Sequence, residues 1–326
     1  MTDRRTFLVT LAGGIVVVPL PGRAQQPAKI PRIGVIGERT ASDAFVAAFR
    51  QALRDLGYVE GQNILVEFRS TNGMLDRVPE IARELVRMPV DVLVVGGGVS
   101  AQYAKAATTT VPIVFTTVGD PVGIGLVASL SRPGGNATGM SNLQSELGAK
   151  QLELLKEVAP RITRVAVLYN PGSPISAAVV RGVQDVARPL AIELLLVDVR
   201  HPDEVPSVLS ALAGRRADAV LVLSDPVFGS HLAKIAQATA KLRLPSVYAR
   251  REFAVAGGLL AYGPNFEDNY RSAATYVDKI LKGAKPAELP VQQPTKLELI
   301  INRKTANSLG LAIPKSVLLR ANEVIQ

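Results

Sequence analysis

The sequence contains no cysteine and no tryptophan among its 326 residues, and only two histidines. The lack of cysteine excludes disulfides, thiolate metal sites, cysteine nucleophiles and a lipid anchor on an amino-terminal cysteine. The lack of tryptophan excludes a pocket walled by indole rings. His201 and His231 stand in no paired-histidine, His-Glu-x-x-His or Ser-His-Asp context, and no Gly-x-Ser-x-Gly elbow occurs. The sequence therefore offers no recognisable catalytic set.

The chain is also poor in concentrated charge, although its formal net charge is +9. Its basic residues are scattered, and no basic run is longer than a pair such as Arg215-Arg216 or Arg250-Arg251. A nucleic-acid-binding protein gathers such residues in a stripe with aromatics between them, so we expect no nucleic-acid partner and interpret the charge as solvated surface. A composition that is 48% hydrophobic and 20% charged is typical of a globular protein, and the length suffices for two domains.

The amino terminus has the pattern of an export signal. Arg4-Arg5 precedes the apolar stretches 7–11 and 15–20, and the small residue Ala24 ends the segment. This pattern predicts a signal peptide over 1–24, followed by a Pro/Gln-rich linker over 25–31. Two arginines before an apolar stretch leave both the twin-arginine route and the ordinary secretory route open. We expect a periplasmic protein that is not a lipoprotein.

One arrangement recurs along the rest of the chain. Short apolar, β-rich runs each end in a small polar loop, and most are followed by a helix-like segment; the runs lie near residues 33–36, 91–95, 112–115, 164–168, 219–223 and 245–248. Nearly continuous apolar strands that alternate with helices indicate parallel sheets covered on both faces. The sequence therefore predicts an α/β protein with two doubly wound parallel-sheet lobes.

The boundaries of the two lobes follow from where the chain can pass between them. A first passage is expected at about 140–146. The helix expected near 267–282 and the Pro-rich stretch 286–294 can carry the chain back and forth again. We expect lobe 1 to comprise residues 32–140 plus about 266–290, and lobe 2 to comprise 141–265 plus about 291–326.

The candidate site residues lie at the carboxyl ends of the predicted strands, because open parallel sheets bind ligands outside those ends. From the first lobe the candidates are Glu38, Thr40, Ser42, Gly98, Ser100, Thr116, Thr117 and Asp120. From the second lobe they are Tyr169, Asn170, Ser173, Asp225, Phe228 and Tyr248. No metal or cofactor site is expected.

Several of these candidates have a structural interpretation as well as a functional one. Ser100 after three glycines either caps a helix or marks a helix amino terminus that receives a carboxylate. Asp120 before Pro121 predicts a cap for a helix over about 122–130. Asp225 before Pro226 either caps a helix or meets a ligand ammonium. Phe228 and its neighbouring tyrosines form either core or a stacking wall.

Two long segments resemble a known family. The stretch from Gly119-Asp120-Pro121-Val122-Gly123 to Asn136-Ala137-Thr138-Gly139 resembles a signature of the tryptophan/tyrosine-type ABC-transporter substrate-binding proteins. The carboxyl-terminal run 289–302 and the closing segment 305–325 are similar to the same family. The likeness covers about residues 30–326.

The resemblance implies a type I periplasmic-binding fold with two lobes joined by three crossing strands. It implies capture of a small solute, with an amino acid as the leading guess, and delivery to a membrane permease driven by a separate ATPase. We expect a monomeric receptor that closes around its ligand by hinge motion, and not an enzyme. A ligand-sensing domain of a regulatory system and an exported α/β enzyme are the competing interpretations.

Overall fold

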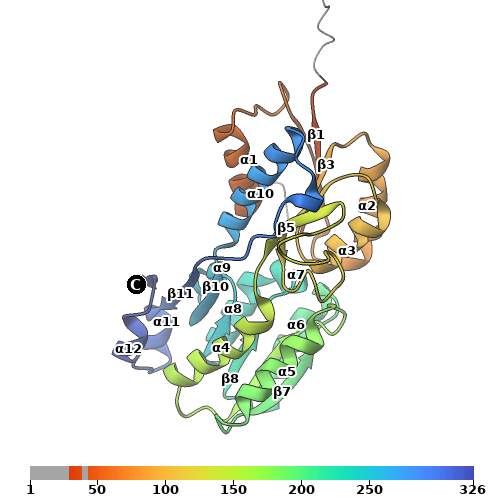
Figure 1. Ribbon diagram of the computed structural model, residues 1–326. Helices are drawn as coiled ribbons and strands as arrows, with labels where there is room; N and C mark the ends of the chain where they lie inside the picture. The colour runs from red at the N-terminus through yellow and green to blue at the C-terminus, as the bar shows by residue number, and fades with distance from the viewer. Residues whose placement is uncertain (1–28, 39–42) are drawn as a thin grey trace, which may run out of the picture.

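The computed structural model describes residues 29–38 and 43–326, which form two lobes, each built on one twisted sheet (Figure 1). The sheet of lobe 1 has five parallel strands in the order β2-β1-β3-β4-β5. Their bounds are β1 Arg32–Gly37, β2 Leu65–Ser70, β3 Val92–Val95, β4 Ile113–Val118 and β5 Ala137–Ser141. The predicted α/β class with parallel-sheet lobes is confirmed.

The sheet of lobe 2 has seven strands in the order β12-β11-β10-β9-β8-β6-β7. Their bounds are β6 Arg164–Tyr169, β7 Glu193–Asp198, β8 Ala219–Val222, β9 Ser246–Tyr248, β10 Leu260–Pro264, β11 Leu297–Asn302 and β12 Glu323–Ile325. Only the pairing of β10 with β11 is antiparallel. β8 is buried along its whole length and β6 everywhere except at its two ends, which is why both read as nearly continuous apolar runs.

Helices cover both faces of each sheet. Lobe 1 carries α1 Ala44–Asp55, α2 Val78–Arg87, α3 Gly98–Ala107 and α10 Phe266–Leu281. Lobe 2 carries α4 Gln144–Val158, α5 Ser176–Ala187, α6 Val205–Leu212, α7 Pro226–Gly229, α8 Leu232–Lys241, α9 Arg251–Val255, α11 Arg303–Ser308 and α12 Lys315–Leu318. Separate apolar clusters lie on the two faces of each sheet, so each lobe has its own core.

The chain crosses between the lobes three times. It leaves the first sheet after β5 for α4, returns from β10 to α10, and crosses again over residues 289–296 to β11. The first and third crossings lie side by side, because Ser141 N donates to Gln292 O at 2.8 Å and Gln292 N donates to Gly139 O at 2.9 Å. Gly139 itself has φ 147°. A Cβ there would overlap the carbonyl oxygen of Phe115, so only glycine fits this position of the family-like segment.

One predicted helix is absent. Residues 121–125 form only turns, and no helix covers 122–130. Asp120 still acts locally, because its Oδ1 accepts from Gly123 N at 2.8 Å. Asp120-Pro121 therefore starts a turn and not a helix, since the glycines at 123 and 125 favour turns over helix propagation.

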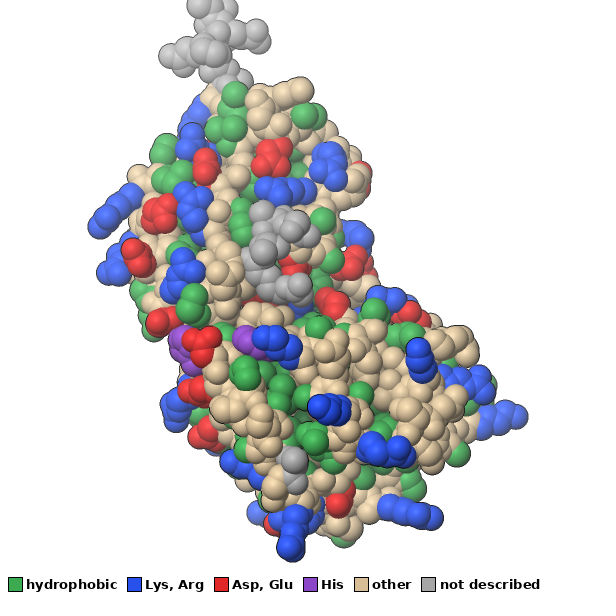
Figure 2. Space-filling model, turned by 180° about the vertical axis from the view of Figure 1, so that it is seen from behind, with side chains coloured by type: hydrophobic (Ala, Val, Ile, Leu, Met, Phe, Trp, Pro, Cys, Tyr) green, Lys and Arg blue, Asp and Glu red, His purple; other side chains and the backbone are tan. Residues whose placement is uncertain are grey.

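Basic side chains are spread over both lobes on the face shown in Figure 2, with acidic side chains among them, and they form no continuous stripe there. Among residues 29–38 and 43–326, no helix is long and apolar enough to cross a membrane.

Candidate functional site

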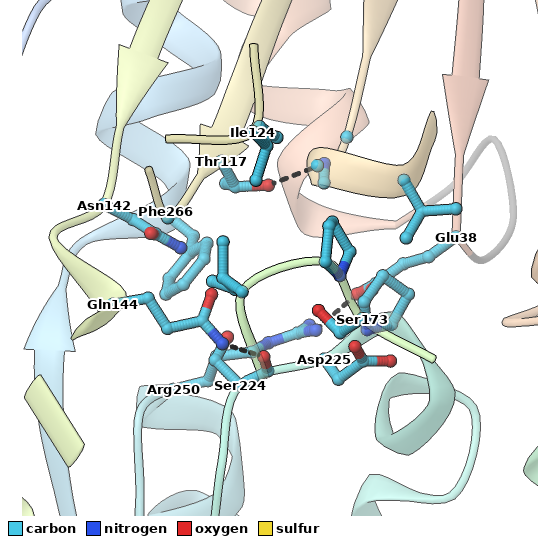
Figure 3. A pocket seen from close by; sticks show the side chains of 18 of the residues that line it. Glu38, Thr117, Ile124, Asn142, Gln144, Ser173, Ser224, Asp225, Arg250 and Phe266 are labelled. Atoms are coloured by element: carbon cyan, nitrogen blue, oxygen red, sulfur yellow. Dashed lines mark hydrogen bonds and ion pairs between the residues drawn. The ribbon is translucent and has the colours of Figure 1, made fainter. Parts of the chain in front are cut away.

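A cavity of about 60 Å³ lies between the two lobes, at the carboxyl ends of the parallel strands (Figure 3). Lobe 1 contributes Glu38, Phe45, Gly96, Gly97, Gly98, Val99, Thr117, Gly119, Ile124, Phe266 and Tyr270. Lobe 2 and the crossing before it contribute Asn142, Gln144, Ser173, Pro174, Ile175, Ser224, Asp225, Pro226 and Arg250. The position agrees with the rule that open α/β sheets bind ligands beyond their strand ends.

The glycine turn before α3 forms part of the wall from lobe 1. Gly97 has φ 82° and is the cap residue of α3, so the turn requires glycine. Gly97 N donates to Thr117 Oγ1 at 3.1 Å, which joins the turn to the end of β4. Beside it, the rings of Phe45 and Tyr270 stack with centroids 5.5 Å apart. This wall is therefore mostly backbone and aromatic surface.

Asp225 is the N-cap of the short helix α7. Its Oδ1 accepts from Val227 N at 3.0 Å and from Asn170 Nδ2 at 3.1 Å. Burial is the main cause that raises the pKa of Asp225 to about 6, and the nearby charge of Glu38 also contributes, whereas these hydrogen bonds and one from Ser173 act to lower it. Both Val227 N and Asn170 Nδ2 donate to Oδ1. Asp225 is thus at once a cap and a buried acid with a raised pKa.

Arg250 is the second charged group of the lobe 2 wall. It follows β9, is only 7% exposed, and donates from Nη1 to Glu38 Oε1 across the cleft. Its guanidinium carbon lies 4.7 Å from the centroid of the Phe45 ring, which also belongs to the other lobe. Burial by itself lowers the pKa of Arg250, but the charges of Glu38 and Glu252 outweigh it and raise the pKa.

One edge of the Arg250 guanidinium is unsatisfied. Among the described residues, Nε and Nη2 have no hydrogen-bond partner, and Glu252 Oε1 is 3.7 Å from Nη2. Buried polar groups are nearly always paired, and the Nε–Nη2 edge suits a carboxylate that binds with both oxygens. Asn142 Oδ1 is also buried without a partner in this part of the chain. Two residues of the cavity wall therefore carry buried polar atoms without a hydrogen-bond partner among the described residues.

Five of the predicted site residues line the cavity, namely Glu38, Gly98, Thr117, Ser173 and Asp225. Asn170 lies behind them and positions Asp225, while its own Oδ1 accepts from Gly172 N at 2.8 Å. Thr40 and Ser42 lie outside the described residues.

The other predicted residues face away from the cavity. Ser100 is buried inside the first turn of α3 and is not its cap, and the hydroxyl of Thr116 points to the carbonyl of Val95. Asp120 is exposed in its turn. The remaining three are aromatics, Tyr169, Phe228 and Tyr248.

Two of these three aromatics belong to the core. Tyr248 is fully buried, with its hydroxyl 2.9 Å from Thr239 Oγ1 and its ring stacked on Phe253, and Phe228 is 1% exposed. A hydrogen bond to Asp198, with burial, raises the pKa of Tyr169, whose hydroxyl is thus turned to β7. Alternation along a strand sends neighbouring side chains to opposite faces, so a strand end alone does not show which residue meets the cleft.

The sequence analysis missed several residues of the site. Arg250 was counted with the solvated charges, although it follows a predicted strand as the other candidates do. Asn142 and Gln144 lie at the first crossing, and Gln144 donates to Ser224 O. The strand before them, β5, is not a continuous apolar run, so the strand pattern did not point to them. Phe45, Phe266 and Tyr270 come from helices, where periodicity indicates only a buried face.

No group of three or more His, Asp or Glu side chains that could hold a metal ion occurs in the part of the chain that is described. The site thus consists of opposite charges, amides, hydroxyls and rings between two lobes. This is the arrangement of a receptor that encloses a small polar ligand.

The model of a protein family described as ABC transporter substrate binding protein matches residues 32–325. The chain belongs to this family. The resemblance found in the sequence is confirmed, and the family is one of binding proteins and not of enzymes. A small-molecule ligand and an ABC transporter are the partners that membership implies.

Similar proteins bear on the ligand. The chain is 29% identical over 279 residues to a "Tyrosine-binding protein" of Clostridioides difficile, covering 86% of this chain and 80% of the relative. A conserved domain protein of Vibrio cholerae has a TM-score of 0.84 at 31% identity, covering 91% of this chain and all of that one. A Streptococcus pneumoniae ABC domain in complex with L-Trp has a TM-score of 0.81 at 26% identity, covering 90% and 99%.

The structure as a whole is more similar to the L-Trp complex than to an open, ligand-free substrate-binding protein. A ligand-free, open substrate-binding protein from Clostridium difficile is 27% identical over 91% of this chain, yet its TM-score is only 0.63. The L-Trp complex has almost the same identity and a TM-score of 0.81. The ion pair of Glu38 with Arg250 joins the two lobes across the cavity.

Proposed function

We propose that this protein is an exported receptor that delivers an α-amino acid to an ABC importer. The observation that carries the proposal is the presence of two oppositely charged side chains, Arg250 and Asp225, in the wall of one cavity. The Nε–Nη2 edge of Arg250 suits the ligand carboxylate, and the carboxylate of Asp225 suits its ammonium. The relatives described as tyrosine-binding and as an L-Trp complex support an aromatic side chain.

The rest of the cavity fits that assignment. Thr117 can donate its hydroxyl to the ligand while its Oγ1 accepts from Gly97. Asn142 Oδ1 offers a further acceptor for the ammonium. Phe266 and Tyr270 offer aromatic surface to the ligand side chain.

The size of the cavity sets a condition on binding. At about 60 Å³ it has room for a few waters, since one water needs at least about 10–15 Å³. An aromatic amino acid is larger, so the lobes must open to admit it and stand somewhat further apart when it is bound. This is hinge motion about the three crossings.

The decisive test is a thermal-shift screen of the purified protein against L-amino acids, their amides, the corresponding amines, sugars and nucleobases. We expect aromatic L-amino acids to stabilise the protein, by about 2.7 kcal/mol at 100 times Kd. Amides and amines should fail, because each lacks the charge that Arg250 requires. Stabilisation by a sugar or nucleobase and by no amino acid would overturn the proposal.

The carboxylate assignment has its own test. Arg250→Gln should lower the affinity for an amino acid by about 100-fold, because the buried carboxylate of the ligand loses its paired charge. The matched control is Arg251→Gln, which removes an exposed neighbour that pairs with Glu323 outside the cavity. Equal loss in both variants would point to a structural cause, and unchanged affinity in Arg250→Gln would reject the assignment.

Export is proposed from the amino-terminal pattern. The mature protein should begin near Gln25 in a periplasmic extract, and Arg4→Lys with Arg5→Lys should block export only if the twin-arginine route is used. Recovery of protein with an intact Met1 from the cytoplasm alone would contradict export.

We also propose a monomer that docks on a membrane permease with a separate ATPase. Light scattering tests the first point, and co-purification with the permease tests the second.

A further inference from the structure

Glu38 is the one charged side chain that the described part of lobe 1 contributes to the cavity wall. It stands just after β1 and reaches across the cleft to Arg250 of lobe 2 (Figure 3). It also lies against α7, because a Cβ on Gly229 would come within 2.9 Å of Glu38 Oε1. The absence of a side chain at Gly229 thus makes room for this carboxylate.

The same helix carries Asp225 at its start, so two carboxylates from opposite lobes lie at α7 when the cleft is closed. The charge of Glu38 is among the causes that raise the pKa of Asp225, which agrees with their proximity. Arg250 is the one cation that lines the cavity among the described residues. The described residues of the cavity wall therefore carry two carboxylates and one guanidinium.

This balance decides which ligand charges the cavity tolerates. An amino acid with a neutral side chain adds no net charge, and one with a cationic side chain neutralises the excess. An acidic side chain adds a further negative charge in a space shielded from water, where like charges repel strongly. Because Glu38 belongs to lobe 1 and contacts Arg250 of lobe 2, the repulsion acts when both lobes enclose the ligand.

We propose that Glu38 is a specificity-determining residue, which makes the closed cleft accept amino acids with neutral or cationic side chains and exclude those with acidic ones. The inference rests on the proposed amino acid function and names the charge class of the ligand. Its physical basis is the position of Glu38 against α7, which begins at Asp225, with Arg250 as the cation that the described cavity wall sets beside both acids.

Two isosteric ligand pairs test it by calorimetry. They are L-glutamine against L-glutamate, and 4-carbamoyl- against 4-carboxy-L-phenylalanine, so that small and aromatic side chains are both covered. In the wild type the amide should bind about 100-fold more tightly than the acid. In Glu38→Gln this gap in affinity between amide and acid should shrink to about tenfold or less, mainly because the acid binds more tightly.

Two further variants separate charge in the cavity from charge near Arg250. Glu252→Gln removes a carboxylate 3.7 Å from the same guanidinium but outside the cavity wall, so the gap should persist. Gly229→Ala keeps both acids but displaces the Glu38 carboxylate from α7, so the gap should narrow. Alanine also suits a helix better than glycine, which preserves the fold.

A gap of the same size in Glu38→Gln and wild type overturns the inference and leaves the amino acid function intact. An equal narrowing in Glu252→Gln also overturns it, because general electrostatics would then be the cause. If no amino acid binds the wild type, both the proposed function and this inference fall. Thermal unfolding of each variant checks that the lobes are folded.

Discussion

The two walls of the cleft differ in chemistry. Lobe 1 offers the glycine turn before α3 and the rings of Phe45, Phe266 and Tyr270, with Glu38 at the edge. Lobe 2 offers Asp225 and Arg250, and its Asp225 is held in place by Asn170 of the same lobe. Asp225 is thus supported by lobe 2 alone, whereas Arg250 also contacts Glu38 and Phe45 of lobe 1. We expect a ligand to load onto lobe 2 first, and lobe 1 to add apolar surface and Glu38 on closure.

The largest effect should come from the lobe 2 acid. Asp225→Asn keeps the Oδ1 acceptor for Val227 and Asn170 but removes the charge, so amino acid affinity should fall at least about 100-fold by calorimetry. Asn170→Ala leaves the charge of Asp225 but removes a hydrogen bond that supports it, so it should weaken binding less than Asp225→Asn does. Near-wild-type affinity in Asp225→Asn would mean that lobe 2 does not hold the ammonium.

The same substitution should stabilise the ligand-free protein. The pKa of Asp225 is raised from an ordinary 3.8 to about 6 in the folded state. The stabilisation that protonated Asp225 contributes to the folded state is therefore fully present below the unfolded pKa of 3.8, and it is lost as pH rises through about 6. At pH 7.5 Asp225→Asn should raise the free energy of unfolding by about 2 kcal/mol, whereas at pH 4 the gain should largely vanish. Urea denaturation at both pH values measures this, and a loss of stability at pH 7.5 would contradict it.

Binding itself should depend on pH in the wild type. The ammonium requires ionised Asp225, so Kd should rise about tenfold for each pH unit below about 6. Glu38 and Arg250 face the same cavity, and the charge of Glu38 is among the causes of the raised pKa of Asp225. Asp225→Asn should bind weakly with a flat profile between pH 5 and pH 8. A parallel decline in both proteins would assign the pH effect to another group.

A smaller effect is expected from the aromatic wall of lobe 1. Phe45→Leu keeps apolar volume but removes the ring that lies over Arg250, 4.7 Å from its guanidinium carbon. Affinity for an aromatic amino acid should fall about fivefold, because a stacked ring contributes roughly 1 kcal/mol. The matched control is Phe253→Leu, whose ring stacks on Tyr248 in the core of lobe 2. If Phe253→Leu weakens binding as much as Phe45→Leu, the loss does not come from the aromatic wall of lobe 1.

The smallest effect should separate two neighbouring hydroxyls. Thr117→Val removes a hydroxyl that lines the cavity and accepts from Gly97 N, so affinity should fall a few-fold. Thr116→Val removes a hydroxyl that points to Val95 O behind the wall, so affinity should stay within twofold. Calorimetry with one ligand compares them. A larger loss of affinity in Thr116→Val than in Thr117→Val would contradict the assignment of Thr117 to the cavity wall.

The alternation of strands and helices, with continuous apolar runs, determined the α/β class, the parallel sheets and the side on which the site lies. Strand hydrophobicity and topology are enough for this, because the carboxyl ends of parallel strands share one edge. The same rule brought Glu38, Gly98, Thr117, Ser173 and Asp225 to the cavity. The two family-like segments gave the family itself.

Tertiary structure alone decided which strand-end residues turn into the cleft and which partners they meet there. Tyr248 and Arg250 are two residues apart, yet one is core and the other lines the cavity. Arg250 becomes a buried anchor because closure brings Glu38 and Phe45 over it from the other lobe. Local sequence records propensity and pattern, whereas burial and charge balance arise from segments that are far apart in the chain and meet only when both lobes are packed together.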